Sequence, residues 1–487
     1  MHRILKSVVY ARKKLLKSVV YTQRKLLKNV TTMLYRKISA YLEEYLRSQN
    51  DKILIMEGAR QIGKSFIIRA VGKQVYPNFI EVNFVEDDEG PQLFKNIHNV
   101  DDFYFALSSV AGTQLNDYSD TLIFLDEIQH YPQYLTLLKF FRQDHKYRFI
   151  TSGSLLGITL RKTTSIPVGS VIRKRMYQLD FEEWLIANGF GEAALKQLKE
   201  CYEQRQSLSE EMHEYVLSLF KRYLLVGGLP DVVNTYLESH NIAKVREVQN
   251  AIIDLYKDDA AKYEDEAEKK LFIRRIYDMI PSQMENKKKR VVVKDIQNKT
   301  GDRYDNYTEE FEYLVSTGIA LDVHAISNPR YPLSESLQKN LLKLYLNDIG
   351  LLTSRLYGLN IKAVMETEKS VNLGAVYESV VAQEFSMHGH NLFYYDNRSK
   401  GEVDFIIDDT EGCRVMPVEV KSGKDYNVHS ALNNFVTNSE YRIEKAIVIS
   451  NEREIKHDGK VLYMPVYFVM FMQAKLATEM DESELIF

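Results

Sequence analysis

The amino-acid sequence predicts an α/β protein of several domains, with a parallel sheet in its first half and a smaller α/β domain at its end. Three observations lead to this prediction. Short β-rich runs alternate with helical patterns from Lys52 onward, the composition becomes helical and strongly charged after Pro230, and strand-like runs return after Gly374. Alternation of this kind is typical of a parallel sheet that helices cover on both faces.

The size and composition of the chain agree with this fold class. A length of 487 residues exceeds what one hydrophobic core supports, so about two to four domains are expected. The hydrophobic fraction of 45% and the charged fraction of 27% are those of a soluble globular protein. No run approaches the roughly 18 apolar residues of a membrane span. We therefore expect no transmembrane segment and a cytoplasmic location.

Cysteine content and net charge restrict the class of protein further. Cys201 and Cys413 lack the spacing of a zinc cluster or a disulfide framework, which fits a reducing compartment and packing roles. The formal net charge of -3 gives the molecule no overall basic character. Any nucleic-acid partner, DNA included, would have to be held by a local basic patch.

Residues 1–42 form the first expected unit, a basic amphipathic helical repeat. No acidic residue precedes Glu43, and segment 5–10 recurs as segment 16–21, a period of 11 residues. On a helix this period aligns the apolar positions in a nearly straight stripe with Lys and Arg beside it. Two interpretations stay open: a solvated helical extension, or an amphipathic helix that binds an anionic membrane surface or phosphate backbone.

The strands of the first large domain, which we expect at 43–230, are apolar and short. They are placed at 52–56, 80–84, 121–125 and 147–151. The helical run that begins at Phe66 directly follows a glycine-containing loop after the first of these strands. This strand, loop and helix order is the context that a phosphate-binding loop requires.

The second half is expected to hold a helical connector with a winged-helix unit at 231–330, and a smaller α/β domain at 331–487. The winged-helix pattern consists of a strand-like run from Arg290, a polar turn, a helix over 304–317 and another strand-like run. The last domain is expected to begin with a helix from about Gly374. Its strands are placed at 392–395, 402–407, 414–421 and 445–450.

A phosphate-binding loop of the P-loop pattern follows the first strand. It consists of Gly58, Ala59, Arg60, Gln61, Ile62, Gly63, Lys64 and Ser65. The glycines let consecutive backbone N–H groups point inward, and the start of the helix adds its positive dipole end. We expect Lys64 to reach the β and γ phosphates of ATP and Ser65 to ligate Mg²⁺. The alternative is a glycine turn that fits the pattern by chance.

Two carboxylates follow the buried strand at 121–125. Asp126 is expected to hold the Mg²⁺ shell, and Glu127 to orient the attacking water. Their place at the carboxyl end of a strand favours function, because α/β sheets bind ligands at that edge. Together with the loop, the pair predicts ATP binding and hydrolysis.

Other side chains could complete the ATP site. Ser152 and Ser154 leave the strand at 147–151, where they could touch the γ-phosphate or the attacking water, or simply bond within a turn. An arginine that stabilises the transition-state charge could be Arg161, Arg173 or Arg175. For any single one of them an ordinary surface arginine is the more common interpretation, and the sequence does not choose among them.

From about Tyr35 to its end the chain resembles the prokaryotic AAA-type ATPases that carry a C-terminal domain of unknown function. Six segments carry this resemblance: 57–65, 124–129, 153–157, 167–170, 180–184 and 227–230. The resemblance implies a P-loop NTPase fold of the AAA type and ATP binding, and it leaves the pathway undefined. Many members of that family have threonine in place of Ser65, and both hydroxyls ligate Mg²⁺.

The C-terminal domain contains a second group of chemistry-bearing residues. Asp404 lies on one expected strand, Glu419 and Lys421 share a face of the next, and Glu378 comes from the preceding helix. This group resembles the PD-(D/E)XK nuclease fold, in which carboxylates hold a divalent metal and the lysine acts on the water. The alternatives are a surface ion-pair ladder, or the fold without cleavage. Arg398 could contact phosphate or be a solvent-exposed charge.

Three functions are therefore carried forward. The first is an Mg²⁺-dependent ATPase whose nucleotide state repositions the winged-helix and C-terminal domains, with DNA, a protein partner or a second copy of the chain as candidate partners. The second is an ATP-regulated, metal-dependent nuclease. The third is an interaction scaffold with structural ATP, which would have no need of a water-orienting Glu127.

Overall fold

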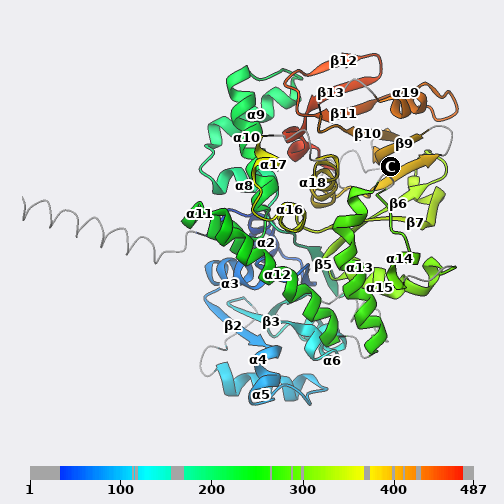
Figure 1. The fold of residues 1–487 in the computed structure, drawn as a ribbon. Helices are drawn as coiled ribbons and strands as arrows, with labels where there is room; N and C mark the ends of the chain where they lie inside the picture. The colour runs from blue at the N-terminus through cyan, green and yellow to red at the C-terminus, as the bar shows by residue number, and fades with distance from the viewer. Residues whose placement is uncertain are drawn as a thin grey trace, which may run out of the picture. The chain divides into compact units, whose positions relative to one another are not determined.

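The computed structural model describes residues 33–111, 115, 119–154, 169–263, 266–286, 289–297, 301–366, 373–397, 401–409, 412–423 and 429–474 (Figure 1). Most of the basic repeat lies outside these residues, as do Arg161 and Arg398, so the hypotheses on them stay predictions. The chain divides into two units, Met1–Arg36 and Lys37–Phe487, and the second holds every feature described below.

The first half contains the predicted parallel sheet. Its five strands run in the order β2-β3-β4-β1-β5 and all pair in parallel. Their bounds are β1 Ile53–Glu57, β2 Asn78–Asn83, β3 Thr121–Asp126, β4 Arg148–Gly153 and β5 Val171–Arg175. Four strands lie within two residues of their predicted positions. The sequence did not predict β5, because an edge strand that is only half-buried carries charged residues instead of an apolar run.

Helices pack on this sheet around a core rich in aromatic residues. The elements are α2 Lys37–Arg47, α3 Lys64–Val75, α4 Phe84–Glu89, α5 Val100–Ala111, η2 Ile128–His130 and α6 Gln133–Asp144. Strand β3 is buried at every position, as the unbroken apolar run 121–125 indicates. The rings of Phe84, Phe103, Tyr134 and Phe141 belong to the same core cluster. This packing fixes the ends of β1, β3 and β4.

The middle of the chain is helical and begins before the expected connector. It comprises α8 Phe181–Ala187, α9 Glu192–Glu203, α10 Glu210–Val226, α11 Pro230–Ser239, α12 Ile242–Tyr263 and α13 Ala267–Glu285. Asp180 and Ser209 cap α8 and α10 through their side-chain oxygens, and Pro230 occupies the first turn of α11. The charged stretch after Pro230 forms long helices, as its composition indicates.

A second, mixed sheet has the strand order β12-β13-β11-β10-β9-β8-β6-β7. Its strands are β6 Ala320–Ile326, β7 Leu337–Leu346, β8 Phe393–Asn397, β9 Gly401–Asp409, β10 Arg414–Val420, β11 Ala446–Ser450, β12 Lys456–Asp458 and β13 Val461–Pro465. All four predicted C-terminal strands are present, as β8 to β11. β9 pairs antiparallel with β10, and β10 pairs in parallel with β11.

The expected winged-helix unit differs from the structure. The run after Arg290 forms no strand, and the helical pattern over 304–317 divides into η3 Tyr304–Tyr307 and α15 Thr308–Ser316. Strand β6 pairs with β7 and β8, so it belongs to the second sheet. The boundary expected at residue 330 therefore passes between two paired strands.

The remaining elements are short helices and turns of the second half, together with the longer helix α18. They are α14 Lys294–Gln297, η4 Leu333–Ser336, α16 Ile349–Tyr357, α17 Lys362–Met365, α18 Gly374–Met387, α19 Ser430–Thr437 and η5 Val466–Phe471. Helix α18 is buried on nearly all sides. Among the described residues, no helix combines the length and the apolar character that a membrane crossing requires.

Candidate functional site

The P-loop joins β1 to α3 and depends on its glycines. Gly58 and Gly63 have φ angles of 142° and 89°, and Gln61 also lies in the left-handed region at 64°. A Cβ atom at Gly58 would collide with the carbonyl oxygen of Met176, so no other residue fits there. The loop ends at Lys64, where α3 begins, so the free N–H groups of the first helical turn are available to an anion.

Lys64 is enclosed by the loop that precedes it. Its side chain is nearly buried at 6% exposure, and its Nζ donates to the carbonyl oxygens of Gly58 and Ala59 at 3.0 and 2.8 Å. Burial lowers the pKa of Lys64 to about 8, although the charges of Glu127 and Asp126 oppose that change. A desolvated cation within a ring of backbone groups is suited to a phosphate.

Asp126 lies at the centre of a small polar group. Its side chain is 2% exposed, and it accepts hydrogen bonds from the Ser152 hydroxyl and, at 3.1 Å, from the Glu127 backbone N–H. Burial raises the pKa of Asp126, while hydrogen bonds from Ser152 and Ser65 act in the opposite direction. Ser65 and Asp126, both predicted Mg²⁺ ligands, are therefore in contact. Oxygen ligands of this kind fit Mg²⁺.

Glu127 has a backbone conformation that is uncommon for residues other than glycine. Its φ and ψ angles are 54° and 45°, in the left-handed region. Its carboxylate accepts a hydrogen bond from the Gln129 side chain and one of 3.3 Å from the Ser154 hydroxyl. Backbone strain of this type is found at functional sites, where surrounding contacts maintain it. Sequence reasoning missed Gln129, although it lies only two positions after Glu127.

Arg60 extends the polar group beyond the sheet. Its Nε donates to Ser154 at 3.3 Å, and its Nη1 forms an ion pair of 2.6 Å with Asp259 on α12. The Tyr256 hydroxyl donates to the backbone oxygen of Arg60 at 2.9 Å. Arg60 thus contacts both the end of β4 and a helix of the connector, and its partners Asp259 and Tyr256 were not predicted.

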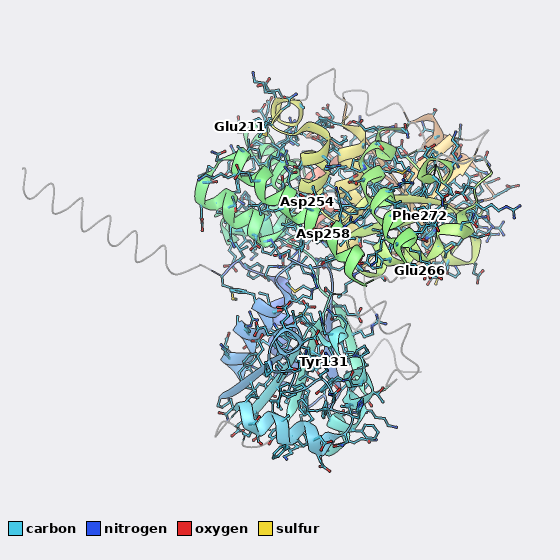
Figure 2. The ribbon with its side chains drawn as sticks, turned by 60° about the horizontal axis from the view of Figure 1, so that its bottom comes forward. Tyr131, Glu211, Asp254, Asp258, Glu266 and Phe272 are labelled. Carbon is cyan, nitrogen blue, oxygen red and sulfur yellow. The ribbon has the colours of Figure 1, made fainter. Side chains whose placement is uncertain are left out.

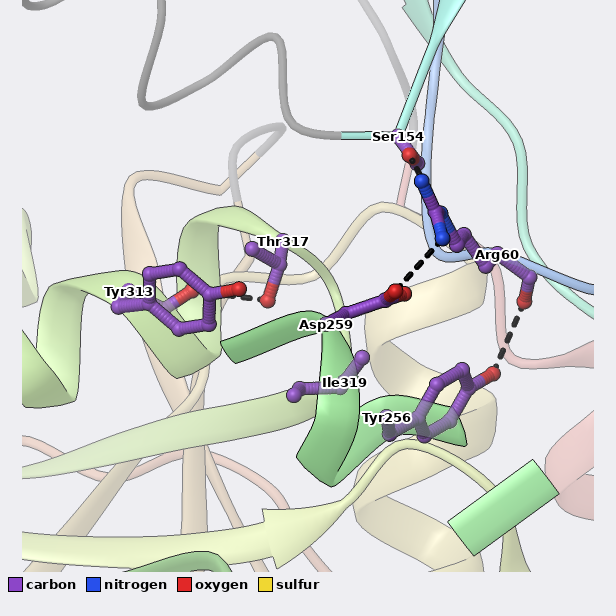
Figure 3. Close-up of a pocket in the computed structure, with 7 residues that line it drawn as sticks. All are labelled: Arg60, Ser154, Tyr256, Asp259, Tyr313, Thr317 and Ile319. Carbon is purple, nitrogen blue, oxygen red and sulfur yellow. Dashed lines mark hydrogen bonds and ion pairs between the residues drawn. The ribbon is translucent and has the colours of Figure 1, made fainter. Parts of the chain in front are cut away.

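The turn between α15 and β6 also reaches the P-loop. Gly318 lies in the left-handed region at φ 78°, and an added Cβ would lie 3.2 Å from the backbone nitrogen of Ala59. Between this turn, α12 and the P-loop lies a cavity (Figure 3). Its lining residues are Arg60, Ser154, Tyr256, Asp259, Tyr313, Thr317 and Ile319. Its volume of about 10 Å³ is close to the least that one water needs.

The two described candidates for a transition-state arginine have other partners. The Nη2 of Arg173 pairs with the Glu57 carboxylate at 2.9 Å, and the Nη2 of Arg175 donates to the Val315 carbonyl at 3.0 Å. Arg173 therefore ties β5 to the end of β1, and Arg175 ties β5 to α15. Arg161 lies outside the described residues.

The lowered pKa of Lys64 leads to a prediction about pH. Above about pH 8 the free protein loses the Lys64 proton, and a bound phosphate favours its return. The dissociation constant for ATP is therefore expected to be nearly level at neutral pH and to rise roughly tenfold per pH unit above about 8. A Lys64→Arg protein, whose side chain stays charged, should lack this rise. Nucleotide titrations over the pH range would contradict the prediction if both proteins gave the same profile.

In the C-terminal sheet, Glu378 is already neutralised by lysines. This 1% exposed carboxylate on α18 accepts hydrogen bonds from Lys343 at 2.9 Å, from Tyr345 at 2.6 Å, and from Lys289. Burial opposes ionisation, but the charges of Lys343 and Lys289 outweigh it and lower the pKa of Glu378 to about 2. Sequence reasoning missed both lysines, because each lies far along the chain from Glu378.

The other three predicted residues lie on β9, β10 and just after β10. Asp404 accepts from the Val420 backbone N–H at 2.9 Å, and Glu419 accepts from Lys421 at 2.7 Å. Burial and the Asp404 charge raise the pKa of Glu419 to about 8. Within the described ranges, no three His, Cys, Asp or Glu side chains are grouped as a metal site requires. The lysines that pair with Glu378 already supply the positive charge that a metal ion would otherwise provide there.

Comparisons with known proteins agree with the geometry at the P-loop. Residues 50–185 match the family model described as AAA domain. Residues 217–362 and 373–469 match two families described as domains of unknown function, DUF8612 and DUF4143. No curated protein matched the chain in sequence.

The comparison with solved structures matched the chain to proteins of low sequence identity, two of which are described next. The Walker-type ATPase PABY2304 of Pyrococcus abyssi is 12% identical, with a TM-score of 0.41, over 66% of this chain and 96% of its own. The RuvB Holliday junction branch migration motor of Thermotoga maritima is 14% identical, with a TM-score of 0.27, over 61% of this chain and 90% of its own.

The family match covers the glycine loop, Asp126 and Glu127 at the end of β3, and the end of β4. The parallel sheet and the P-loop geometry described above are those of a P-loop NTPase. Residues 50–185 therefore belong to the AAA family, as a P-loop domain that two domains of unknown function follow.

Proposed function

We propose that this chain binds ATP with Mg²⁺ at the loop 58–65 and hydrolyses it. The observation that carries the proposal is the position of Asp126, which is hydrogen-bonded to Ser65 of the loop helix and to Ser152 of β4. In support, the oxygens of Ser65 and Asp126 are of the type that Mg²⁺ prefers, and the helix N-terminus beside them is suited to phosphates. Lys64 would supply the point charge on the β and γ phosphates.

The remaining polar residues would act on the attacking water. Glu127 would orient the water or accept its proton, with Gln129 and Ser154 holding the carboxylate in place. Ser152 would act through Asp126. Mg²⁺ would neutralise charge on the phosphates. The protein's own groups would bind the nucleotide, orient the attacking water and exclude bulk water.

We further propose that nucleotide state repositions the connector and the second sheet. In support, α12 contacts the P-loop through Asp259 and Tyr256, and the turn at Gly318 packs on Ala59. A change of loop conformation would therefore reach both segments directly. We propose an ATPase domain at 43–230 and a connector that follows it; because β6 pairs with β7 and β8, the C-terminal domain expected at 331–487 begins before Ala320.

The partners and the location are part of the same proposal. A cytoplasmic protein that assembles with itself or with a protein partner is consistent with a AAA domain, and DNA is the candidate partner for a nucleotide-driven machine. The basic repeat at 1–42 is the segment that would contact an anionic surface.

The test of the main proposal is phosphate release by the full chain, with Mg²⁺ and with the metal chelated. Sustained turnover that depends on Mg²⁺ is expected. Tight binding of a labelled ATP analogue without turnover would instead support the scaffold function, and absence of binding would reject both.

A metal-dependent nuclease is the second candidate function. The observation that favours it is the buried pair Asp404 and Glu419. Burial, and after it the Glu378 charge, raises the pKa of Asp404, while burial and the Asp404 charge raise the pKa of Glu419. Such a pair is costly unless a proton or a cation neutralises it, and Lys421 lies beside it. Cleavage of a plasmid in the presence of Mg²⁺ or Mn²⁺ would establish the activity.

Metal binding at this pair has a thermal signature. Mn²⁺ should raise the melting temperature of the nucleotide-free full chain, by mass action on the folded state. The rise should grow with pH, because metal binding must release the proton that Glu419, with its pKa of about 8, holds at neutral pH. Asp404→Asn combined with Glu419→Gln should remove the rise. Equal shifts in the wild-type and double-variant proteins would leave the P-loop as the metal-binding centre.

A further inference from the structure

Arg60 has a different set of contacts from the other loop residues. Its guanidinium is held between a hydroxyl of the AAA domain, Ser154, and a carboxylate of the connector, Asp259. Both side chains of the ion pair are largely buried, at 21% and 10% exposure. Asp259 is 199 residues away in sequence, so this contact joins two separate parts of the chain.

The position of Arg60 is next to the groups that would hold phosphate. Its charge is one of the causes that lower the pKa of Lys64, so the two cations lie close enough to repel. Its partner Ser154 is also the donor to Glu127, the residue proposed to orient water. A guanidinium beside the loop lysine and within one hydroxyl of the water-orienting acid is placed to meet the terminal phosphate of a triphosphate.

We propose that Arg60 is the residue that distinguishes ATP from ADP, by exchanging Asp259 for the γ-phosphate as the partner of its guanidinium. This inference rests on the proposed function, because it requires that the loop bind nucleotide. Asp259 and a γ-phosphate are both anions, and Arg60 Nη1 bonds Asp259 at 2.6 Å, so the two compete for the same charge. ADP lacks the competing group, so with ADP Arg60 stays paired with Asp259.

The exchange would couple the nucleotide to the connector. With Arg60 on the phosphate, α12 would lose the ion pair between Asp259 and Arg60 and would keep the hydrogen bond from Tyr256 to the loop backbone. ATP can bind to Arg60 only if the ion pair with Asp259 breaks. The free energy of that ion pair therefore reduces the free energy of ATP binding by the same amount. Removing the Asp259 charge should therefore increase the affinity for ATP and leave the affinity for ADP unchanged.

The experiment measures ATP and ADP dissociation constants in proteins that carry Glu127→Gln, so that ATP is not consumed. Asp259→Asn nearly preserves the shape of the side chain. It is expected to lower the dissociation constant for ATP by about tenfold and to change that for ADP by less than about twofold. In an Arg60→Gln background the same Asp259→Asn change should have no effect, as a double-mutant cycle requires for a shared interaction. Melting temperatures establish that each variant is folded.

The matched control is Asp258→Asn, one position earlier on α12 (Figure 2). Asp258 pairs with Arg274 at 3.0 Å on an exposed face, and its change should affect neither nucleotide. A second readout is amide hydrogen exchange of α12. With Arg60 and Asp259 both present, exchange should be faster with ATP than with ADP. In the Arg60→Gln protein the two nucleotides should give equal exchange rates.

The outcomes separate this inference from the function beneath it. If the parent protein binds neither ATP nor ADP, the proposed function fails. If the parent binds both, the inference is overturned by equal effects of Asp259→Asn on ATP and ADP, by no effect on ATP, or by an undiminished effect in the Arg60→Gln background.

Discussion

A Lys64→Ala protein is expected to lose tight ATP binding while it keeps its fold. The Lys64 ammonium is placed on both the β and γ phosphates, and its surroundings are desolvated. Removing one such charge should weaken binding by a hundredfold or more, on the order of other preorganised electrostatic contacts. The measurement is titration with a labelled ATP analogue.

The fold should survive because Lys64 is a costly residue in the free protein. Its lowered pKa means that burial already penalises the charged form, so an alanine removes a cost as well as two hydrogen bonds to loop carbonyls. The melting temperature should therefore stay close to that of the parent. Undiminished ATP affinity in a folded Lys64→Ala protein would reject the assignment of the loop.

A Glu127→Gln protein is expected to bind ATP as well as the parent and to hydrolyse it at least about a hundredfold more slowly, the lower end for loss of a positioned general base. The change is nearly isosteric, so the hydrogen bonds from Gln129 and Ser154 lose charge but keep a partner oxygen. Phosphate release under saturating ATP is the measurement.

The control for this prediction is Glu57→Gln at the end of β1. Glu57 is a carboxylate at the same edge of the sheet, but its side chain pairs with Arg173 on the neighbouring strand β5. Its change should slow turnover only slightly. A wild-type rate in Glu127→Gln, or equal losses in both variants, would move the water-orienting role elsewhere.

Local patterns in the sequence account for most of the first domain. The P-loop and the acid pair are short motifs whose strand and helix context is contiguous, whereas the hydrogen bond from Ser152 to Asp126 was not predicted. Strand β5 was not predicted because it lies at the edge of the sheet, where its residues Val-Ile-Arg-Lys-Arg are only partly buried. The strand therefore has no apolar run that the sequence could show.

Long-range pairing accounts for what the sequence did not predict. Arg60 was expected only as a loop residue, because nothing local indicates a partner 199 positions away. The lysines that neutralise Glu378 lie 89 and 35 positions from it. The winged-helix pattern over 304–317 matched the local helix but not the pairing of β6, since strand partners are chosen by the whole sheet.

The position of β6 in the second sheet has a consequence for dividing the chain into fragments. β6 lies between β7 and β8, in the interior of the strand order. A fragment that begins at residue 331 would lack it, and both β7 and β8 would then present an unpaired edge to solvent. Exposed edges of this kind template pairing with other chains and promote aggregation. A soluble fragment of the C-terminal sheet must therefore begin before Ala320, and it would carry with it the glycine turn that packs against the nucleotide loop.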